Sequence, residues 1–467
     1  MDQTAEQLLL RDIDLFVEEN KEGVLRDLKT LVDIPSVENA PAPGAPFGAD
    51  VKRALDAALE MARGMGLAPH SCEGYFGYAD LPGKSEKQLG VITHLDVVPA
   101  GNGWAGDPFG MIRREGYVLG RGVADDKGPA VLTLYAAKFF AQRGEPLPYT
   151  LRLLFGTNEE TGMAGLSYYL AHNAAPAFCF TPDAEFPVCY AEKGIYNGSV
   201  HSARLTGSLV SFEGGVAGNV VPDLAVAVVR ADAAALRGTD AVTVEDAGEG
   251  LVRITGHGKG GHASLPQGTV NAILLVTDYL LDHALCSESE RAFLRFLHTL
   301  LCVTDGSTVG IAAHDDIFGA LTCIGGTLHF ADGVLTQTLD IRYPTTTTGA
   351  ALTQALTAAA AAAGAVFAPR RDTVPFVTSA SDPAVKALID VYNEVTGEHA
   401  APFSMGGGTY AREFPRAVSF GMEDPGADYP AWVGSMHGAN EGIPETLLWK
   451  SLKIYILGIA RLMEQPL

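Results

Sequence analysis

The sequence predicts an α/β domain with mostly parallel strands, interrupted by an inserted α+β domain. Strand-like and helix-like segments alternate from the N-terminus to about residue 194, as parallel sheets require. From about Asn197 strand-like segments dominate, with helices between some of them. Helix-like segments resume after residue 381, and 467 residues are too many for one hydrophobic core. We therefore expect a first domain over 1–194 and 381–467, and an inserted domain over 195–380.

The first domain begins with two predicted helices. Residues 5–33 have the spacing of an amphipathic helix that ends before Ile34-Pro35, and a second helix covers roughly 50–66. QLGVITHLDVVPAG is an almost continuous apolar run, which is typical of a strand buried on both faces. The next predicted elements are a helix over 131–144 closed by Gly144, a strand over 149–155, a helix over 163–173 and a strand over 178–187.

The inserted domain is predicted mainly from strand-like runs. These are HSARLTGSLVSFEGG, DLAVAVVR, GLVRITGHGKGGH and VLTQTLDIRYP, with helices near Thr269–Asp282 and Leu352–Ala363. Helices over Ala384–Thr396 and Glu445–Met463 then return to the first domain.

Composition excludes several classes of partner. The formal net charge of −22 argues against nucleic acid or an anionic membrane surface. The acidic N-terminus lacks the basic and apolar parts of a signal peptide, and the best apolar stretch, Ala351–Ala368, is an alanine-rich helix. Six scattered cysteines without CxxC spacing indicate reduced thiols, so we expect a cytoplasmic protein.

Acids and histidines follow the predicted strands of the first domain. They are His94 and Asp96 in THLD, Asp125 and Asp126 in GVADD, Glu159 and Glu160 in NEE, Asp183 in TPDAE, and His437 in SMHGANE. Each motif alone has an ordinary explanation, such as a helix N-cap or a solvated loop. Ligand sites of parallel sheets nevertheless collect at the carboxyl ends of the strands, where these residues fall.

So many carboxylates cannot share one cleft without cations, because neighbouring negative charges force some to stay protonated. Two divalent cations would resolve this conflict, and mixed histidine and carboxylate ligands fit Zn²⁺, with Mn²⁺ and Co²⁺ as alternatives. Asp96, two residues after His94 on the same side of a strand, is placed to orient that imidazole.

The same motifs resemble a known family. HLDVVPAG, GRGVADDKGP, NEETG, TPDAEFP, GGHAS and SMHGANE look like those of the co-catalytic dizinc aminohydrolases, which include aminoacylase, carnosinase and succinyl-diaminopimelate desuccinylase. SFEGG with AGNVVPD, LDIRYP and GGGTYAREFP extend the resemblance to the PepV-type dipeptidases. The resemblance covers nearly the whole chain in the same order.

The resemblance implies a role for each residue. Asp125 would bridge two metal ions. His94 and Asp183 would complete one site, and Glu160 and His437 the other. Glu159 would be the general base for a metal-bridging water that attacks a peptide bond, and Asp96 would orient His94. Asp126 is expected to turn away and cap the following helix.

The inserted domain would close over the substrate as a lid. His262 in GGHAS is the expected donor to the developing oxyanion, with a structural histidine as the alternative and His257 as a rival. Arg342 is expected to pair with the substrate's C-terminal carboxylate, or else with Asp340. Asn219 is expected to contact substrate, or else to serve only as a turn residue.

The glycine-rich GGGTYAREF is expected to hold the substrate's C-terminal end through Gly408, Thr409 and Arg412. The leading hypothesis is therefore a monomeric metallo-dipeptidase for short peptides with a free N-terminus, including β-Ala or D-Ala types. The alternatives are an N-acyl-amino-acid amidohydrolase of the same family and a catalytically inactive binding protein.

Overall fold

The computed structural model describes residues 3–424 and 426–467, and the chain divides into two compact units. The first unit comprises Met1–Tyr190, Val377–Phe403 and Thr409–Leu467, and the second comprises Ala191–Phe376 and Ser404–Gly408. The segment Ser404–Gly408 thus clusters with the second unit, although the sequence places it in the first domain. Hydrogen bonds explain this, since the Lys193 N–H donates to the Met405 carbonyl and Ser404 Oγ donates to the Ile317 carbonyl.

The main sheet of the first unit is mixed, with a parallel centre. The neighbouring strands β6, β3, β7 and β23 run parallel, whereas β1, β2 and β8 pair antiparallel at its sides. The predicted α/β class is confirmed, and the antiparallel margins qualify the predicted mostly parallel sheet. In spatial order the strands are β1 (Ala68–Cys72), β2 (Phe76–Leu81), β6 (Tyr149–Gly156), β3 (Ser85–His94), β7 (Phe178–Thr181), β23 (Ala417–Ser419), β8 (Cys189–Glu192) and β21 (Phe376–Val377), with β22 (Phe403–Met405) also paired to β8.

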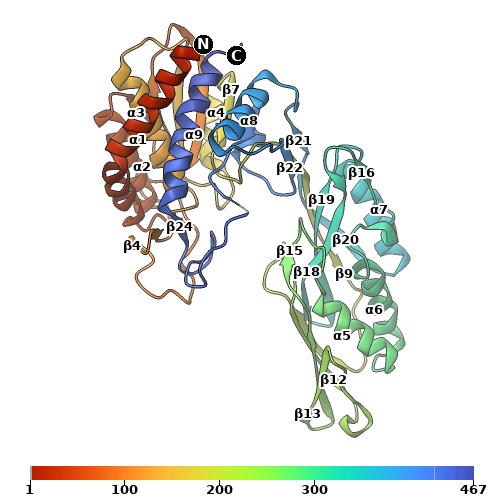
Figure 1. Ribbon diagram of the computed structural model, residues 1–467. Helices are drawn as coiled ribbons and strands as arrows, with labels where there is room; N and C mark the ends of the chain where they lie inside the picture. Colours follow the sequence, from red (N-terminus) through yellow and green to blue (C-terminus); the bar gives the residue numbers. More distant parts are fainter. Residues whose placement is uncertain (1–2, 425) are drawn as a thin grey trace. The chain divides into compact units, whose positions relative to one another are not determined.

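Helices cover this sheet. Helix α3 is buried along most of its length and contacts β3, β6, α1 and α9. Helices α1 and α9 lie side by side in Figure 1. Helix α3 ends where Gly144 takes a left-handed conformation (φ 65°), as predicted. The helices are α1 (Gln3–Val32), α2 (Ala49–Gly64), α3 (Lys127–Arg143), α4 (Ala164–His172), α8 (Pro383–Thr396) and α9 (Glu445–Met463), with the 3₁₀ turn η3 (Tyr410–Glu413).

A small three-stranded sheet connects distant parts of the first unit. Strand β5 (Tyr117–Leu119) pairs with β4 (Ile112–Arg114) and with β24 (Gly442–Pro444), all antiparallel. The Gly120 N–H donates to the Glu441 carbonyl at the end of this pairing. The chain before α3 and the chain before α9 are therefore held together.

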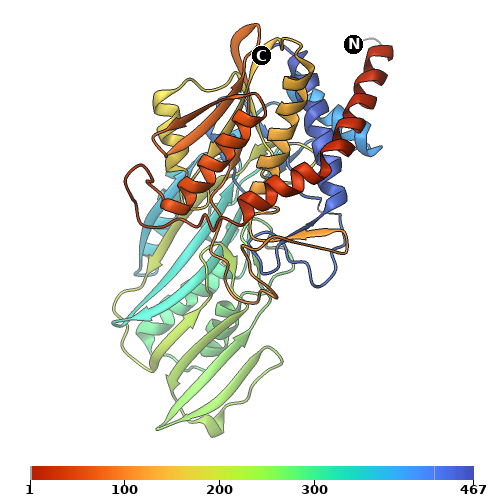
Figure 2. The same cartoon turned by 90° about the vertical axis from the view of Figure 1, so that its left-hand side faces the viewer.

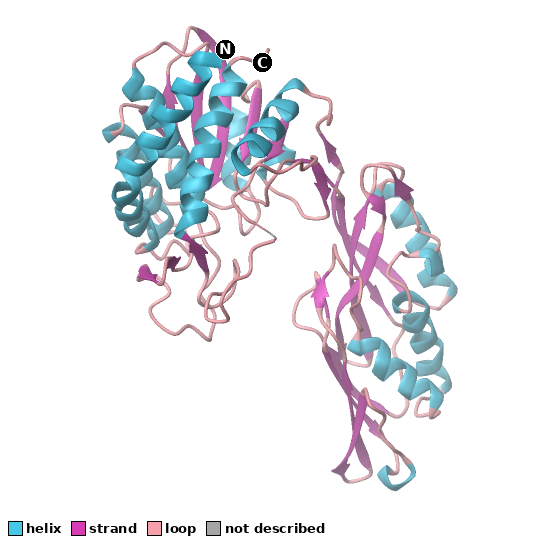
Figure 3. Cartoon of the chain, viewed as in Figure 1, coloured by secondary structure: helices cyan, strands magenta, loops and turns pink. Residues whose placement is uncertain are grey.

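The second unit is an antiparallel sheet with helices along one face (Figure 3). Its strands lie side by side in Figure 2. In spatial order they are β13 (Val242–Gly248), β14 (Leu251–His257), β12 (Leu224–Arg230), β10 (Leu209–Gly214), β18 (Thr322–Ala331), β19 (Val334–Tyr343), β9 (Gly194–His201) and β20 (Val366–Thr373). The other elements are α5 (Ala272–Asp282), α6 (Glu288–Leu301), α7 (Gly349–Ala362), the pairs β11 (Val220–Val221) with β15 (Gly261–His262) and β16 (His314–Asp315) with β17 (Gly319–Ala320), and the turns η1 (Ala233–Ala235) and η2 (Ser307–Val309).

Helix α6 is not among the predicted elements. It begins with a capping box, in which the Ser287 hydroxyl accepts from the Glu290 N–H and the Glu290 carboxylate accepts from the Ser287 N–H. Glu290 is buried, and its carboxylate also accepts from the Leu209 N–H at 2.9 Å and the Ser208 N–H at 3.2 Å. One side chain therefore fixes both the start of α6 and the start of β10.

Replacing Glu290 by Gln is expected to lower the free energy of unfolding by about 2 kcal/mol at pH 7, since charge-assisted hydrogen bonds are lost. Burial alone would raise the pKa of Glu290, but the N–H donors of Ser287 and Leu209 outweigh it and lower the pKa. The stabilisation is thus present above the unfolded pKa and is lost as pH falls through the folded pKa. Denaturant unfolding at pH 7 and pH 3 measures this difference, and an unchanged difference at pH 3 would contradict it. The exposed Glu288→Gln variant is the control.

None of the helices in the described part of the chain combines the length and the apolar character that crossing a membrane requires. All six cysteines are free thiols.

Candidate metal centre

The candidate site lies at the carboxyl ends of the parallel strands in the first unit. Strand β3 ends with His94, which lies opposite Gly156 at the end of β6, so Glu159 and Glu160 follow beside it. Asp183 follows β7 directly. Asp125 lies two residues before α3, and His437 lies in the loop between β23 and β24. The predicted acids and histidines of the first domain are therefore gathered in one place.

Asp125 lies between the two imidazoles. Its Oδ1 is 2.9 Å from His94 Nε2, and its Oδ2 is 2.8 Å from His437 Nε2. Each oxygen of this carboxylate thus faces a different histidine. The carboxylate is thus held between the two imidazoles.

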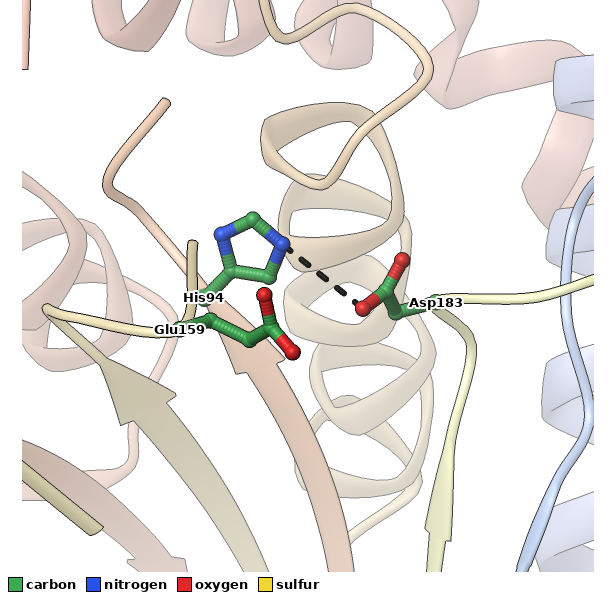
Figure 4. Close-up of side chains that lie close together, drawn as sticks. All are labelled: His94, Glu159 and Asp183. Atoms are coloured by element: carbon green, nitrogen blue, oxygen red, sulfur yellow. Dashed lines mark ion pairs between the residues drawn. The ribbon is translucent and has the colours of Figure 1, made fainter. Parts of the chain in front are cut away.

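The other carboxylates are arranged around these three residues. His94 Nε2 is 3.7 Å from Asp183 Oδ2, and Figure 4 shows Glu159 beside this pair. His437 Nε2 is 3.2 Å from Glu160 Oε1. Asp183 therefore pairs with His94, and Glu160 pairs with His437.

The His94 ring contacts two acceptors of Asp96, and the backbone carbonyl is the nearer one. His94 is fully buried, and its Nδ1 is 2.9 Å from the Asp96 carbonyl oxygen. The Asp96 carboxylate lies farther away, at 3.6 Å from Nδ1, and accepts from the Glu160 N–H at 3.2 Å. With Nδ1 protonated, Nε2 is left as the nitrogen that faces Asp125. The second oxygen of the Asp96 carboxylate also supports the turn that carries Glu160.

Asp126 turns away from the site, but it does not cap α3 as the sequence analysis expects. No side-chain hydrogen bond caps this helix, and the peptide bond between Asp125 and Asp126 is cis. Asp126 Oδ2 accepts from the His94 N–H at 2.9 Å. Its carboxylate therefore holds the end of β3 next to α3.

The protonation of the site reflects crowded negative charge. Burial raises the pKa of Glu159 well above its usual value, and Asp183 and Glu160 raise it further against the opposing effect of His94. Burial and the Asp125 carboxylate raise the pKa of Asp183 to about 8. Hydrogen bonds to Asp125 and Glu160 raise the pKa of His437 to about 10. Without a further cation, protons neutralise part of this charge.

These residues fit a metal ion. Two groups of three residues each have their donor atoms within 4.8 Å of one another, namely His94 with Asp125 and Glu160, and His94 with Glu159 and Asp183, and His437 is in neither group. Imidazole nitrogen and carboxylate oxygen are the donors that Zn²⁺, Mn²⁺ and Co²⁺ accept. In the described part of the chain, the ion-pair partners of Asp125, Glu160 and Asp183 are the two histidines. The donor set and the excess of acid both favour divalent cations.

The second unit brings several of its own predicted residues together. Val220, next to Asn219, pairs with His262, and the Ala263 N–H donates to the Asn219 carbonyl at 2.9 Å. The exposed His262 has its Nδ1 2.7 Å from Ser264 Oγ. A Cβ atom at Gly406 would lie 2.5 Å from Ser264 Cβ, so this position requires glycine. The glycine segment with Gly408 therefore lies close to His262.

Arg342 forms the ion pair that the sequence analysis gives as its alternative. Its Nε is 2.6 Å from Asp340 Oδ1 and its Nη2 is 3.1 Å from Asp340 Oδ2. Its Nη1 donates to the Gly406 carbonyl at 2.8 Å. Most of the guanidinium is thus engaged within the protein, where it holds the glycine segment.

Thr409 lies directly before η3 and Arg412 lies within it, both in the first unit. The Thr409 side chain is buried, accepts from the Ala411 N–H at 3.1 Å and lies 3.0 Å from Ser419 Oγ. This hydroxyl therefore caps η3.

Three further residues belong to the surroundings of the site but are not predicted. The Tyr410 ring meets the His94 ring edge-on, with centroids 6.4 Å apart. Arg121 and Glu441 are fully buried and form an ion pair. All three lie inside sequence motifs of the first domain. For Arg121 and Glu441, a charged residue among glycines and apolar residues in GRGVADD and SMHGANEG could have indicated a buried ion pair.

Comparison with known proteins agrees with this geometry. Residues 90–461 match the model of the peptidase family M20/M25/M40. The chain is 33% identical over 466 residues to YtjP of Bacillus subtilis (strain 168), which is named a dipeptidase, with 95% of this chain and 98% of that protein covered. It is 32% identical over 475 residues to the beta-Ala-Xaa dipeptidase of Lactobacillus delbrueckii subsp. lactis, with 96% and 98% covered.

Two solved structures share the fold. The di-peptidase Dug1p from Saccharomyces cerevisiae and human carnosine dipeptidase 1 each have a TM-score of 0.63 at 14% sequence identity, covering 98% of this chain and 99% of theirs. The family model spans most of the chain and includes every candidate ligand. The chain therefore belongs to the peptidase family M20/M25/M40.

Proposed function

We propose that this protein is a metal-dependent dipeptidase. The observation that carries the proposal is the position of Asp125, whose two oxygens face His94 and His437 with Glu159 nearby. A bridging carboxylate with a ligand set on each side and an additional acid provides the parts for metal-assisted hydrolysis. The relatives named as dipeptidases support peptides as substrates, and their high coverage supports the same activity for the whole chain.

The proposed ligands form two positions that share Asp125. His94 and Asp183 would complete the first, and Glu160 and His437 the second. We propose two ions, Zn²⁺ with Mn²⁺ and Co²⁺ as substitutes, because both positions contain one imidazole and carboxylates. When bound, the ions would supply Lewis acidity that polarises the scissile carbonyl.

Glu159 is the proposed general base. Its carboxylate lies close to the ligands His94 and Asp183, so a water attacking a peptide held there is within its reach. It takes a proton from that water and returns it to the leaving amine. Glu160, one residue later, faces His437, so one turn supplies both a base and a ligand.

The roles of the second unit's residues toward a substrate stay predictions. His262, Asn219 and Gly408 are the proposed contacts for the peptide. Arg342 is proposed to support this site by holding the Gly406 carbonyl, and to pair with the substrate carboxylate. Thr409 and Arg412 remain the proposed contacts for the C-terminal end of the substrate. We also propose a PepV-type monomer in the cytoplasm, in line with the free thiols.

A substrate panel tests the function. Dipeptides with a free amine, including Ala-, β-Ala- and D-Ala-containing ones, are expected to be hydrolysed with higher kcat/KM than N-acetyl amino acids or tripeptides. Activity should vanish after chelator treatment and return with Zn²⁺, Mn²⁺ or Co²⁺. Preference for N-acetyl amino acids would show the deacylase instead, and absence of any metal-dependent hydrolysis would refute both.

A further inference from the structure

Two fully buried charged residues next to the candidate metal centre have no part in the proposed chemistry. Arg121 and Glu441 are both 0% exposed, and Arg121 Nη1 donates to Glu441 Oε2 at 2.5 Å. They lie beside the pairing of β5 with β24, at positions 320 residues apart in the sequence. A buried ion pair is weak evidence for stability, because desolvation offsets much of its attraction. Both side chains also make hydrogen bonds to the backbone of neighbouring segments.

The second oxygen of Glu441 holds the segment that leads into Asp125. Glu441 Oε1 accepts from the N–H groups of Gly122 and Ala124, both at 3.0 Å, and of Asp125 at 3.3 Å. Converging N–H groups of this kind form an anion-binding concavity, which the carboxylate fills. The backbone position of Asp125 is thus set by Glu441.

The second arm of Arg121 holds the segment that carries His437. Arg121 Nη2 donates to the His437 carbonyl at 3.2 Å and to the Ala100 carbonyl at 3.3 Å. Glu441 itself follows His437 by four residues and accepts the Gly120 N–H through its own carbonyl. The ion pair therefore contacts the backbone of both Asp125 and His437.

We propose that Arg121 and Glu441 are positioning residues that fix the distance between Asp125 and His437 for one metal ion. Neither residue is in the groups of candidate metal ligands found among the described residues. Asp125 Oδ2 and His437 Nε2 lie 2.8 Å apart although they come from separate loops, and metal binding tolerates only small errors in such distances. This inference rests on the proposed function, because it presumes that these two residues bind metal.

The test is the Glu441→Gln variant, which keeps the shape and one oxygen acceptor but removes the charge opposite Arg121. Zn²⁺ affinity at the position formed by Asp125, Glu160 and His437 should fall by about 10–100-fold. Competition with a chromophoric chelator measures the affinity, and elemental analysis after dialysis counts the ions per chain. Excess Zn²⁺ should restore part of the lost kcat/KM, which a general folding defect would not allow.

The matched control is Asp80→Asn. Asp80 pairs with the buried Arg152 in the first unit through two hydrogen bonds of 2.8 and 2.7 Å, and neither residue contacts a proposed ligand in the described hydrogen bonds and ion pairs. This variant should lower the melting temperature but leave Zn²⁺ affinity unchanged. Equal losses of affinity in Asp80→Asn and Glu441→Gln would overturn the positioning role.

Zn²⁺ affinity of Glu441→Gln within about threefold of wild type would also overturn it. Should that variant not fold, Arg121→Lys decides, since it keeps the charge but lacks the second arm that reaches His437. Its Zn²⁺ affinity is expected to fall by about tenfold, and an unchanged value would overturn the proposal. Wild-type protein that binds no Zn²⁺ would instead refute the proposed function.

Discussion

Replacement of Glu159 by Gln is expected to lower kcat by about 10²–10⁴-fold while each chain retains its metal ions. The amide cannot take a proton from water, but it changes the shape of the site very little. The two readouts are steady-state kcat on a free-amine dipeptide and metal content by elemental analysis. Turnover close to that of wild type would show that Glu159 is not the base.

The matched variant is Glu160→Gln, one residue away on the same turn. Glu160 faces His437, so this variant is expected to lose metal as well as activity. The comparison decides which glutamate is the ligand, since Glu159 also lies in a donor group with His94 and Asp183. Loss of metal in Glu159→Gln together with retention in Glu160→Gln would reverse the assignment.

Replacement of Asp125 by Asn is expected to weaken both metal positions and to lower kcat/KM by at least about 10³-fold, because several kcal/mol of metal assistance are lost. The carboxylate holds both imidazoles, with 2.9 Å to His94 and 2.8 Å to His437. An amide offers one oxygen and no charge, so it cannot serve both sides. Elemental analysis and kcat/KM measured with added Zn²⁺ check the prediction.

Asp126→Asn is the control for Asp125→Asn. Burial and the nearby Asp183 carboxylate raise the pKa of Asp126 well above its usual value, so loss of its ionised form is expected to cost little. An amide oxygen can still accept from the His94 N–H. Metal content should stay at the wild-type level. If Asp126→Asn lost both ions while Asp125→Asn kept them, the family pattern would be misapplied to this pair.

Much of the fold follows from local pattern. Helix α9 coincides with the predicted Glu445–Met463, and α3 ends at the predicted Gly144, because apolar spacing and C-capping act over a few residues. Helix α6 was not predicted, because short apolar runs in a sequence do not distinguish a helix from a strand. Its capping box, SESE, was present in the sequence as a usable signal.

The candidate site was predictable in composition because parallel strands bring their carboxyl ends together. His94, Asp125, Glu160, Asp183 and His437 could be grouped from their places after strands. Side-chain direction was not predictable to the same degree. The carbonyl of Asp96 lies nearer to His94 than its carboxylate does, and Asp126 accepts from the backbone at the end of β3. Differences of about 1 Å in atomic position decide such contacts, and residue spacing in the sequence does not specify them.

The sequence by itself determined the fold class, the family motifs and the residue types that crowd negative charge around two histidines. Only the tertiary structure decided which of those residues hold one another. Ser404–Gly408 joins the second unit, Arg342 pairs with Asp340, and Arg121 meets Glu441 across 320 positions of sequence. These choices arise from buried hydrogen bonds between distant segments, whose partners are selected by packing and not by local pattern.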